Sequence, residues 1–117
     1  MGRDETRRWR VGALVYSGRP DPSWDVSPST AAACVHAFEK LEHTRAAVPD
    51  QASLGYRGAW LLAPDSRRWD AFNGIAWSAQ DRRGDPERAM ERALLESAPD
   101  ATLPSEWRQW LFPLRSE

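Results

Sequence analysis

The chain has 117 residues, a common size for one domain, and its 16 basic and 17 acidic residues give a formal net charge of −1. This balance argues against a general attraction to nucleic acid or to an anionic membrane surface. A single cysteine, Cys34, excludes an internal disulfide and fits a reducing compartment. The N-terminal region has no apolar run long enough for a signal core or a membrane span. We therefore expect a soluble, cytoplasmic protein with a single domain over residues 1–117, in which residues 1–7 form a flexible tail.

The first predicted element is a strand over residues 9–16, which is rich in strand-forming residues. Both of its faces are partly apolar, so we expect it to be covered on both sides or central in its sheet. The strand ends at Ser17-Gly18, and Pro20 and Pro22 follow. Because each proline restricts its own backbone and that of the residue before it, this connection is stiff for its length.

A helix is predicted to begin at Ser27-Pro28, since serine caps helix N-termini and proline suits the first helical position. Apolar residues then recur at helical spacing, and the helix is expected to end near residues 43–45. Its predicted buried stripe is Ala31, Cys34 or Val35, Phe38 and Leu41.

Three further strands are expected in the middle of the chain. The first covers residues 56–62, and the other two flank Asn73-Gly74, which is the strongest short-range signal for a hairpin with a two-residue turn. That turn would pair Phe72 with Ile75 and Asp70 with Trp77. One face of the hairpin would then hold Phe72, Ile75 and Trp77, and the other Trp69, Ala71 and Ala76.

A second helix is predicted to begin at Asp85-Pro86-Glu87 and to stop before Pro99, and a short helix is expected over residues 105–112. The predicted order is β-α-β-β-β-α followed by a short α. The fold class is therefore α+β, with a sheet of about four strands packed by helices mainly on one face.

The segment Ser17–Asp25 is the leading candidate for a functional surface, because connections of this kind often carry function. Arg19 could bind a carboxylate or phosphate of a partner, and Trp24 could supply flat contact area. A structural role is the alternative. In that case the prolines stiffen a connection, Trp24 fills the core, and Arg19 pairs with Asp21 or Asp25.

This segment, with the pattern Ser-Gly-Arg-Pro-x-Pro-x-Trp, is followed by Leu-Gly-Tyr-Arg-Gly over residues 54–58 and by an aromatic-Asn-Gly turn over residues 72–74. The combination resembles that of small uncharacterised bacterial proteins with no established activity. The resemblance spans roughly residues 9–98. It implies that the segment and Tyr56-Arg57 belong together, and it implies no chemistry.

Two other groups of residues are candidates for a functional site. Cys34, His36 and His43 match no known spacing of metal ligands or catalytic groups, and a core role for Cys34 is the simpler interpretation. Arginine and tryptophan adjoin at residues 8–10, 68–69 and 107–108, which could stack nucleic-acid bases on a sheet. The balanced charge instead favours stacking of these arginines on tryptophans of the same chain.

We therefore expect a non-enzymatic binding or protein-interaction module whose partner is another protein or a second copy of the chain. The predicted binding residues are Arg19, Asp21, Trp24, Tyr56 and Arg57. The alternative is a small-molecule ligand-binding protein or enzyme, with a pocket near Tyr16, Arg19, Trp24, Tyr56 and Arg57. We expect no catalytic residue, no metal site, no cofactor, and no nucleic-acid or membrane partner.

Overall fold

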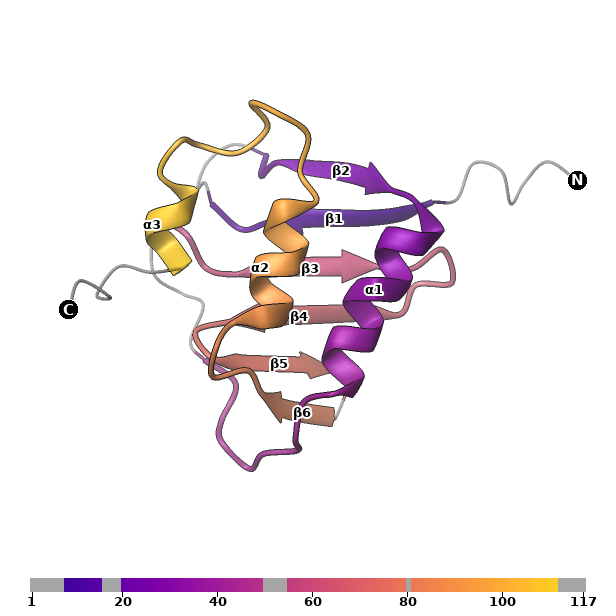
Figure 1. Ribbon diagram of the computed structural model, residues 1–117, viewed down its shortest axis with the longest axis vertical. Coiled ribbons are helices and arrows are strands. Elements are labelled where there is room, and N and C mark those ends of the chain that lie inside the picture. The colour runs from indigo at the N-terminus through magenta and orange to yellow at the C-terminus, as the bar shows by residue number, and fades with distance from the viewer. Residues whose placement is uncertain (1–7, 16–19, 50–54, 80, 112–117) are drawn as a thin grey trace, which may run out of the picture.

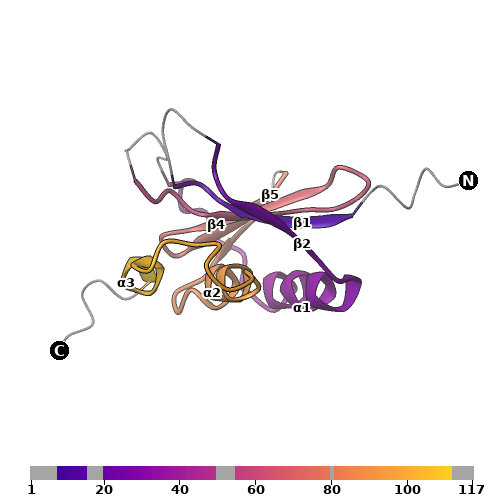
Figure 2. The same ribbon diagram turned by 90° about the horizontal axis from the view of Figure 1, so that it is seen from above.

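The computed structural model describes residues 8–15, 20–49, 55–79 and 81–111. It has an α+β fold in which three helices pack against a six-stranded antiparallel sheet of order β2-β1-β3-β4-β5-β6 (Figure 1). Viewed along the sheet, all three helices lie on the same side of it (Figure 2). The elements are β1 (Trp9–Ala13), β2 (Ser23–Val26), α1 (Pro28–Glu39), β3 (Ala59–Leu62), β4 (Arg68–Phe72), β5 (Ile75–Ser78), β6 (Asp81–Gly84), α2 (Ala89–Glu96) and α3 (Trp107–Leu111).

The sheet has six strands, so the predicted number of about four is wrong. One missed strand, β2, begins within Ser17–Asp25, which we call the proline-bracketed segment, and pairs with β1, with Val11 opposite Trp24. The other, β6, has the sequence Asp-Arg-Arg-Gly and pairs with β5. The Ser-Trp-Asp-Val alternation of β2 covers only four residues, and β6 contains no apolar residue, so neither gives a clear strand signal in the sequence.

The hairpin predicted at Asn73-Gly74 is confirmed. Asn73 and Gly74 have φ angles of 54° and 91°, which is the left-handed backbone that a two-residue turn requires. Phe72 pairs with Ile75 and Asp70 pairs with Trp77, as predicted. The turn therefore sets the register of β4 and β5.

The start of α1 is also confirmed, since the Ser27 side chain accepts a hydrogen bond from the Thr30 backbone N–H at 3.1 Å. The helix ends at Glu39, earlier than residues 43–45. The chain after the helix pairs with β6 instead, since the Gly84 N–H donates to the Glu42 carbonyl at 2.9 Å and the Thr44 N–H donates to the Arg82 carbonyl at 3.0 Å. The Arg83 side chain donates to the Glu39 carbonyl at the helix end at 2.9 Å.

Helix α2 begins at Ala89 and not directly after Asp85-Pro86. Residues 86–88 form a turn instead, in which Arg88 adopts a left-handed conformation with φ 56°. The Asp85 carboxylate still caps the helix across this turn, because it accepts the Ala89 backbone N–H at 2.8 Å. No helix among the described residues is long and apolar enough to cross a membrane.

Side-chain alternation along the strands divides the sheet into two faces. The face toward the helices forms the core, and its strand residues Val11, Ala13, Leu61, Ala71 and Ala76 have no more than 1% of their surface exposed. The helices fill the other side of this core with Ala31, Cys34, Phe38, Met90, Leu94 and Leu95.

On the opposite face, the Trp60 indole lies across Gly12, its neighbour on β1. A methyl group at residue 12 would overlap the Trp60 ring. Glycine is required here because the indole of Trp60 occupies the space of a side chain.

We predict that Gly12→Ala lowers the free energy of unfolding by about 1 to 3 kcal/mol, since the ring must move to admit the methyl group. Gly84→Ala is the matched control, because a Cβ at this strand position meets nothing within 4 Å. It should change stability by less than about 0.5 kcal/mol. Urea denaturation measures both, and equal stability of the two variants would contradict the packing of Trp60 on Gly12.

Candidate functional site

Two predicted site residues, Asp21 and Arg57, lie together at the end of β1. Asp21 Oδ1 accepts the Val15 backbone N–H at 2.8 Å, and its Oδ2 lies 3.8 Å from Arg57 Nη2. The Arg57 backbone N–H donates to the Leu14 carbonyl at 2.7 Å. The proline-bracketed segment and the Tyr56-Arg57 segment therefore hold the same stretch of chain from two sides, and both contacts stabilise the fold.

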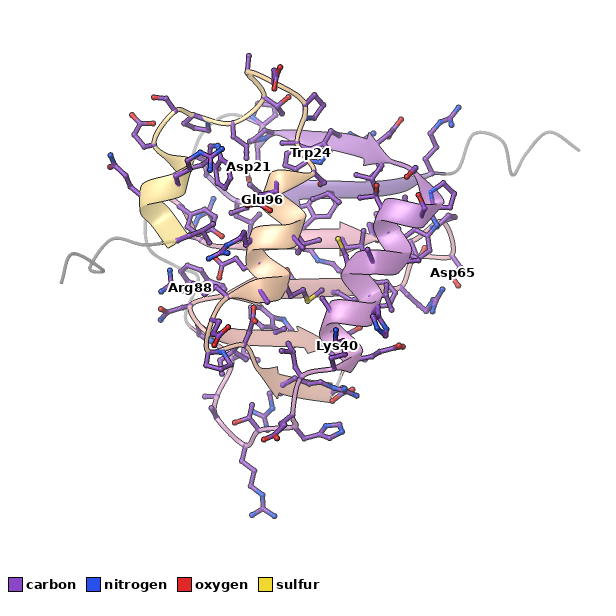
Figure 3. The ribbon with its side chains drawn as sticks, viewed as in Figure 1. Asp21, Trp24, Lys40, Asp65, Arg88 and Glu96 are labelled. Carbon is purple, nitrogen blue, oxygen red and sulfur yellow. The ribbon has the colours of Figure 1, made fainter. Side chains whose placement is uncertain are left out.

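Trp24 lies in the core. Only 5% of its surface is exposed, and its indole N–H donates to the Ser97 hydroxyl at 2.9 Å, at the end of α2 (Figure 3). For Trp24, this burial agrees with the structural role that was the alternative interpretation of the sequence. The indole is therefore not available to a partner. Arg19 and Tyr16 lie outside the described residues.

Because β2 alternates, the neighbours of Trp24 point the other way. Ser23 pairs with Gly12 and Asp25 pairs with Arg10, on the face of the sheet turned away from the helices. We call this face the open face, and the register places on it Arg10, Gly12, Ser23, Asp25, Trp60, Leu62, Arg68, Asp70, Phe72, Ile75, Trp77 and Arg82.

The centre of the open face is a row across the strands in which Asp70 lies between Trp60 and Trp77. Arg68 donates two hydrogen bonds of 2.9 Å to the two oxygens of Asp70. The same guanidinium lies 5.2 Å from the Trp60 ring centre. A bidentate ion pair with an aromatic ring beside it holds these side chains in fixed positions.

Apolar side chains surround this ion pair. They are partly exposed and do not belong to the core cluster on the helix side. Phe72, at the end of β4, also contacts Tyr56, which packs against that cluster, with the two ring centres 5.7 Å apart. A solvated face of an antiparallel sheet usually carries polar residues, so this composition is unusual for a face that no described helix covers. The residues are Trp60, Leu62, Phe72, Ile75 and Trp77.

The sequence predicted part of this surface. The Asn-Gly turn placed Phe72, Ile75 and Trp77 on one face of the hairpin, and the pairing confirms this. The pattern could not show that the helices pack on the other face, nor that Trp60 on β3 joins the same surface. The sequence signal for this surface was that no element was predicted to cover the second face of the sheet.

Charge on the open face is concentrated at its two ends. At the β1–β2 end, Arg10 forms an ion pair with Asp25, and Arg8 lies 3.7 Å from the same carboxylate. At the other end is Arg82 on β6, which makes no ion pair with the described residues. The β1–β2 end therefore carries one more positive than negative charge. At the β6 end, the pairing of residues 42–44 with β6 places Glu42 opposite Gly84, on the same face as Arg82.

Buried polar side chains also meet between α2 and the chain before β3. Glu91 is fully buried and accepts a hydrogen bond from the Tyr56 hydroxyl. Burial raises the pKa of Glu91 to about 7, although the Tyr56 hydrogen bond and the Arg88 charge oppose this effect; the neighbouring Asp85 charge adds to it. Burial and Glu91 together also raise the pKa of Tyr56. Tyr56, a predicted binding residue, therefore anchors the chain before β3 to α2.

The other residues weighed from the sequence have structural surroundings. Cys34 is buried, which raises the pKa of its thiol to about 11 and keeps it protonated. His43 Nδ1 lies 3.0 Å from Asp81. Among the described residues, no group of three or more histidine, cysteine or acidic side chains could hold a metal ion.

Arginines stack on tryptophans of the same chain, and one of the stacks among the described residues joins sequence neighbours. Arg108 lies 4.7 Å from the ring centre of Trp107, while Arg67 stacks on Trp69 at 5.3 Å and Arg68 reaches across to Trp60. These contacts occupy aromatic surface that stacking of nucleic-acid bases would need.

No protein-family model, curated protein or solved structure matches this chain.

We predict that Trp24→Ala lowers the free energy of unfolding by about 3 to 5 kcal/mol, because it leaves a cavity and a hydroxyl without its donor. Asp25→Ala, at the adjacent outward-facing position, should cost less than about 1 kcal/mol. Guanidinium denaturation compares the two. If Trp24→Ala were no more costly than Asp25→Ala, the indole would not lie in the core.

We predict that the free energy of unfolding depends on pH because burial raises the pKa of Glu91. Its native pKa of about 7 lies above the ordinary value of 4.5, so the native state binds this proton more tightly than the unfolded state. The tighter binding of this proton adds its full contribution to the free energy of unfolding at pH values below 4.5. That contribution is lost as the pH rises through about 7. The two pKa values differ by an amount that corresponds to about 3 kcal/mol.

The variant Glu91→Gln does not titrate and can still accept the Tyr56 hydrogen bond. Its free energy of unfolding relative to the wild type should therefore rise by about 3 kcal/mol from acidic to mildly basic pH. Denaturation at a series of pH values measures this difference. Parallel profiles for the two proteins would contradict the raised pKa of Glu91.

Proposed function

We propose that the protein is a non-enzymatic protein-interaction module that binds a partner protein on the open face of its sheet. The observation that carries the proposal is the placement of all three helices on one side (Figure 2), which leaves partly exposed tryptophan, leucine and isoleucine side chains on the other. An apolar surface of a few hundred Å² on a small protein typically marks an interaction site.

The composition of the open face supports a protein partner. Tryptophan and arginine are the residues that most often dominate binding energy at protein interfaces, whereas lysine and glutamate are depleted there. Trp60, Trp77 and Arg68 form the centre, and the charged residues Arg10, Asp25 and Arg82 lie nearer the edges. This is the usual arrangement of an apolar centre with a polar rim.

Rigidity of the centre also supports binding. Asp70 is only 7% exposed and is held by Arg68, and Trp60 is held between Gly12 and the same arginine. A partner that binds these side chains loses little entropy in ordering them, so more of the contact energy contributes to affinity.

The alternative of a small-molecule pocket near Tyr16, Arg19, Trp24, Tyr56 and Arg57 stays a prediction. Three of these residues are described, and each makes contacts that stabilise the fold. Asp21, from the predicted binding set, is likewise held by Val15 and Arg57.

Site-specific photo-crosslinking in cells that produce the protein tests the proposal. A photoreactive phenylalanine analogue replaces Leu62, which lies on the open face beside Trp60. The matched control replaces Ala32, an exposed residue of α1 on the helix side. We expect a protein adduct from residue 62 and none from residue 32, because only the open face contacts a partner.

A further variant links the adduct to the aromatic centre. Trp77→Ser in the residue-62 background should abolish the adduct while the protein remains folded by circular dichroism. Adducts from residue 32 alone, or adducts from residue 62 that persist in Trp77→Ser, would contradict the proposal.

A further inference from the structure

Arginines at the two ends of the open face outnumber the carboxylates that pair with them among the described residues. Arg8 and Arg10 share the single carboxylate of Asp25, whose side chain is 49% exposed. Arg82 makes no ion pair with the described residues, whereas its neighbour Arg83 turns to the helix side and pairs with Asp81. A partner that covers this face must meet the arginines at both ends.

The sheet fixes the distance between these ends. Arg10 on β1 and Arg82 on β6 are separated by four strand spacings, which is about 19 Å. Trp60 and Trp77 lie between them, two strand spacings or about 10 Å apart. The surface is therefore an aromatic stretch with the Arg68–Asp70 ion pair at its centre, and Arg10 and Arg82 lie at its two ends.

A face-to-face dimer whose two-fold axis runs across the strands lays each strand over itself. Arg10 and Arg82 would then lie close to their own copies, and repulsion between like charges disfavours this arrangement.

The area of the face also argues for a small occupant. Six strands of about four residues cover roughly 29 by 13 Å, or about 380 Å². A short segment that crosses the strands fits within this footprint.

We propose that the open face binds a short protein segment in which acidic residues flank an apolar stretch. The acidic groups meet Arg10 and Arg82, and the apolar residues cover Trp60 and Trp77. A helix would span the two cations in about 13 residues, and an extended chain would do so in about 6. This inference rests on the proposed interaction function and adds the chemistry of the partner.

Selection of peptides tests it. Random peptides of about 16 residues, long enough to cross the sheet as a helix, are displayed on phage and selected on the immobilised full-length protein. Selected peptides are synthesised, and their affinities are measured by fluorescence anisotropy. We expect an aromatic or aliphatic stretch with acidic residues on both sides, and an affinity that falls as the salt concentration rises.

Charge reversal identifies the contacts. Arg82→Glu should weaken the selected peptides by about tenfold, because attraction becomes repulsion. Arg10→Glu should act in the same direction. Lys40→Glu is the matched control, since it makes the same charge change at the end of α1, on the helix side (Figure 3). It should leave the affinity unchanged, and circular dichroism checks that every variant folds.

The outcomes separate this inference from the proposed function. Peptides that need Trp77 but ignore both arginine variants would overturn the acidic partner while leaving the interaction function intact. Failure to select any Trp77-dependent peptide would also overturn it, whereas the crosslink from residue 62 reports on the function itself. Tighter binding of a labelled single-stranded oligouridine, lost in Arg82→Glu, would assign the face to nucleic acid instead.

Discussion

Side-chain alternation along the strands is the constraint on which this structure depends, because all three helices pack on one side of the sheet. Each strand residue must therefore lie either in the core or on the open face, and neighbours in the sequence are sent to opposite sides. Arg82 and Arg83 illustrate the consequence. Arg83 pairs with Asp81 and binds the carbonyls at the end of α1, whereas Arg82 is left on the open face without an ion pair among the described residues.

The same alternation changes the interpretation of the proline-bracketed segment. Trp24 and Asp25 are adjacent, yet Trp24 fills the core beside α2 and Asp25 joins the open face. The segment contributes to the proposed binding surface through its small and acidic residues and not through its indole. In the described part of the segment, Asp21 accepts the Val15 backbone N–H and pairs with Arg57.

Much of the fold could be predicted from local signals. Ser27-Pro28 marked the start of α1, and Asn73-Gly74 fixed the register of β4 and β5, because each depends on backbone chemistry within a few residues. Strands β2 and β6 could not be predicted in this way. Their stability comes from pairing with β1 and β5, and β6 carries no apolar residue that would indicate a buried side.

The candidate surface was harder to predict because it depends on long-range packing. The hairpin pattern grouped Phe72, Ile75 and Trp77, but nothing local indicated that the helices would cover the opposite face. Trp60 is placed beside them by the pairing of β3 with β4, and Gly12 provides the space for its ring. The site residues predicted in the sequence were chosen for their chemistry, and those that are described hold the fold together.

The tryptophan indole N–H signals in a two-dimensional NMR spectrum test the central claim most directly, because the chain carries reporters on both faces of the sheet. They are assigned with single Trp→Phe variants and followed as the partner recovered by crosslinking is added. If the partner binds the open face, we expect the signals of Trp60 and Trp77 to shift while those of Trp24 and Trp69, on the core side, stay in place. Shifts of Trp24 and Trp69 with unchanged signals for Trp60 and Trp77 would contradict it.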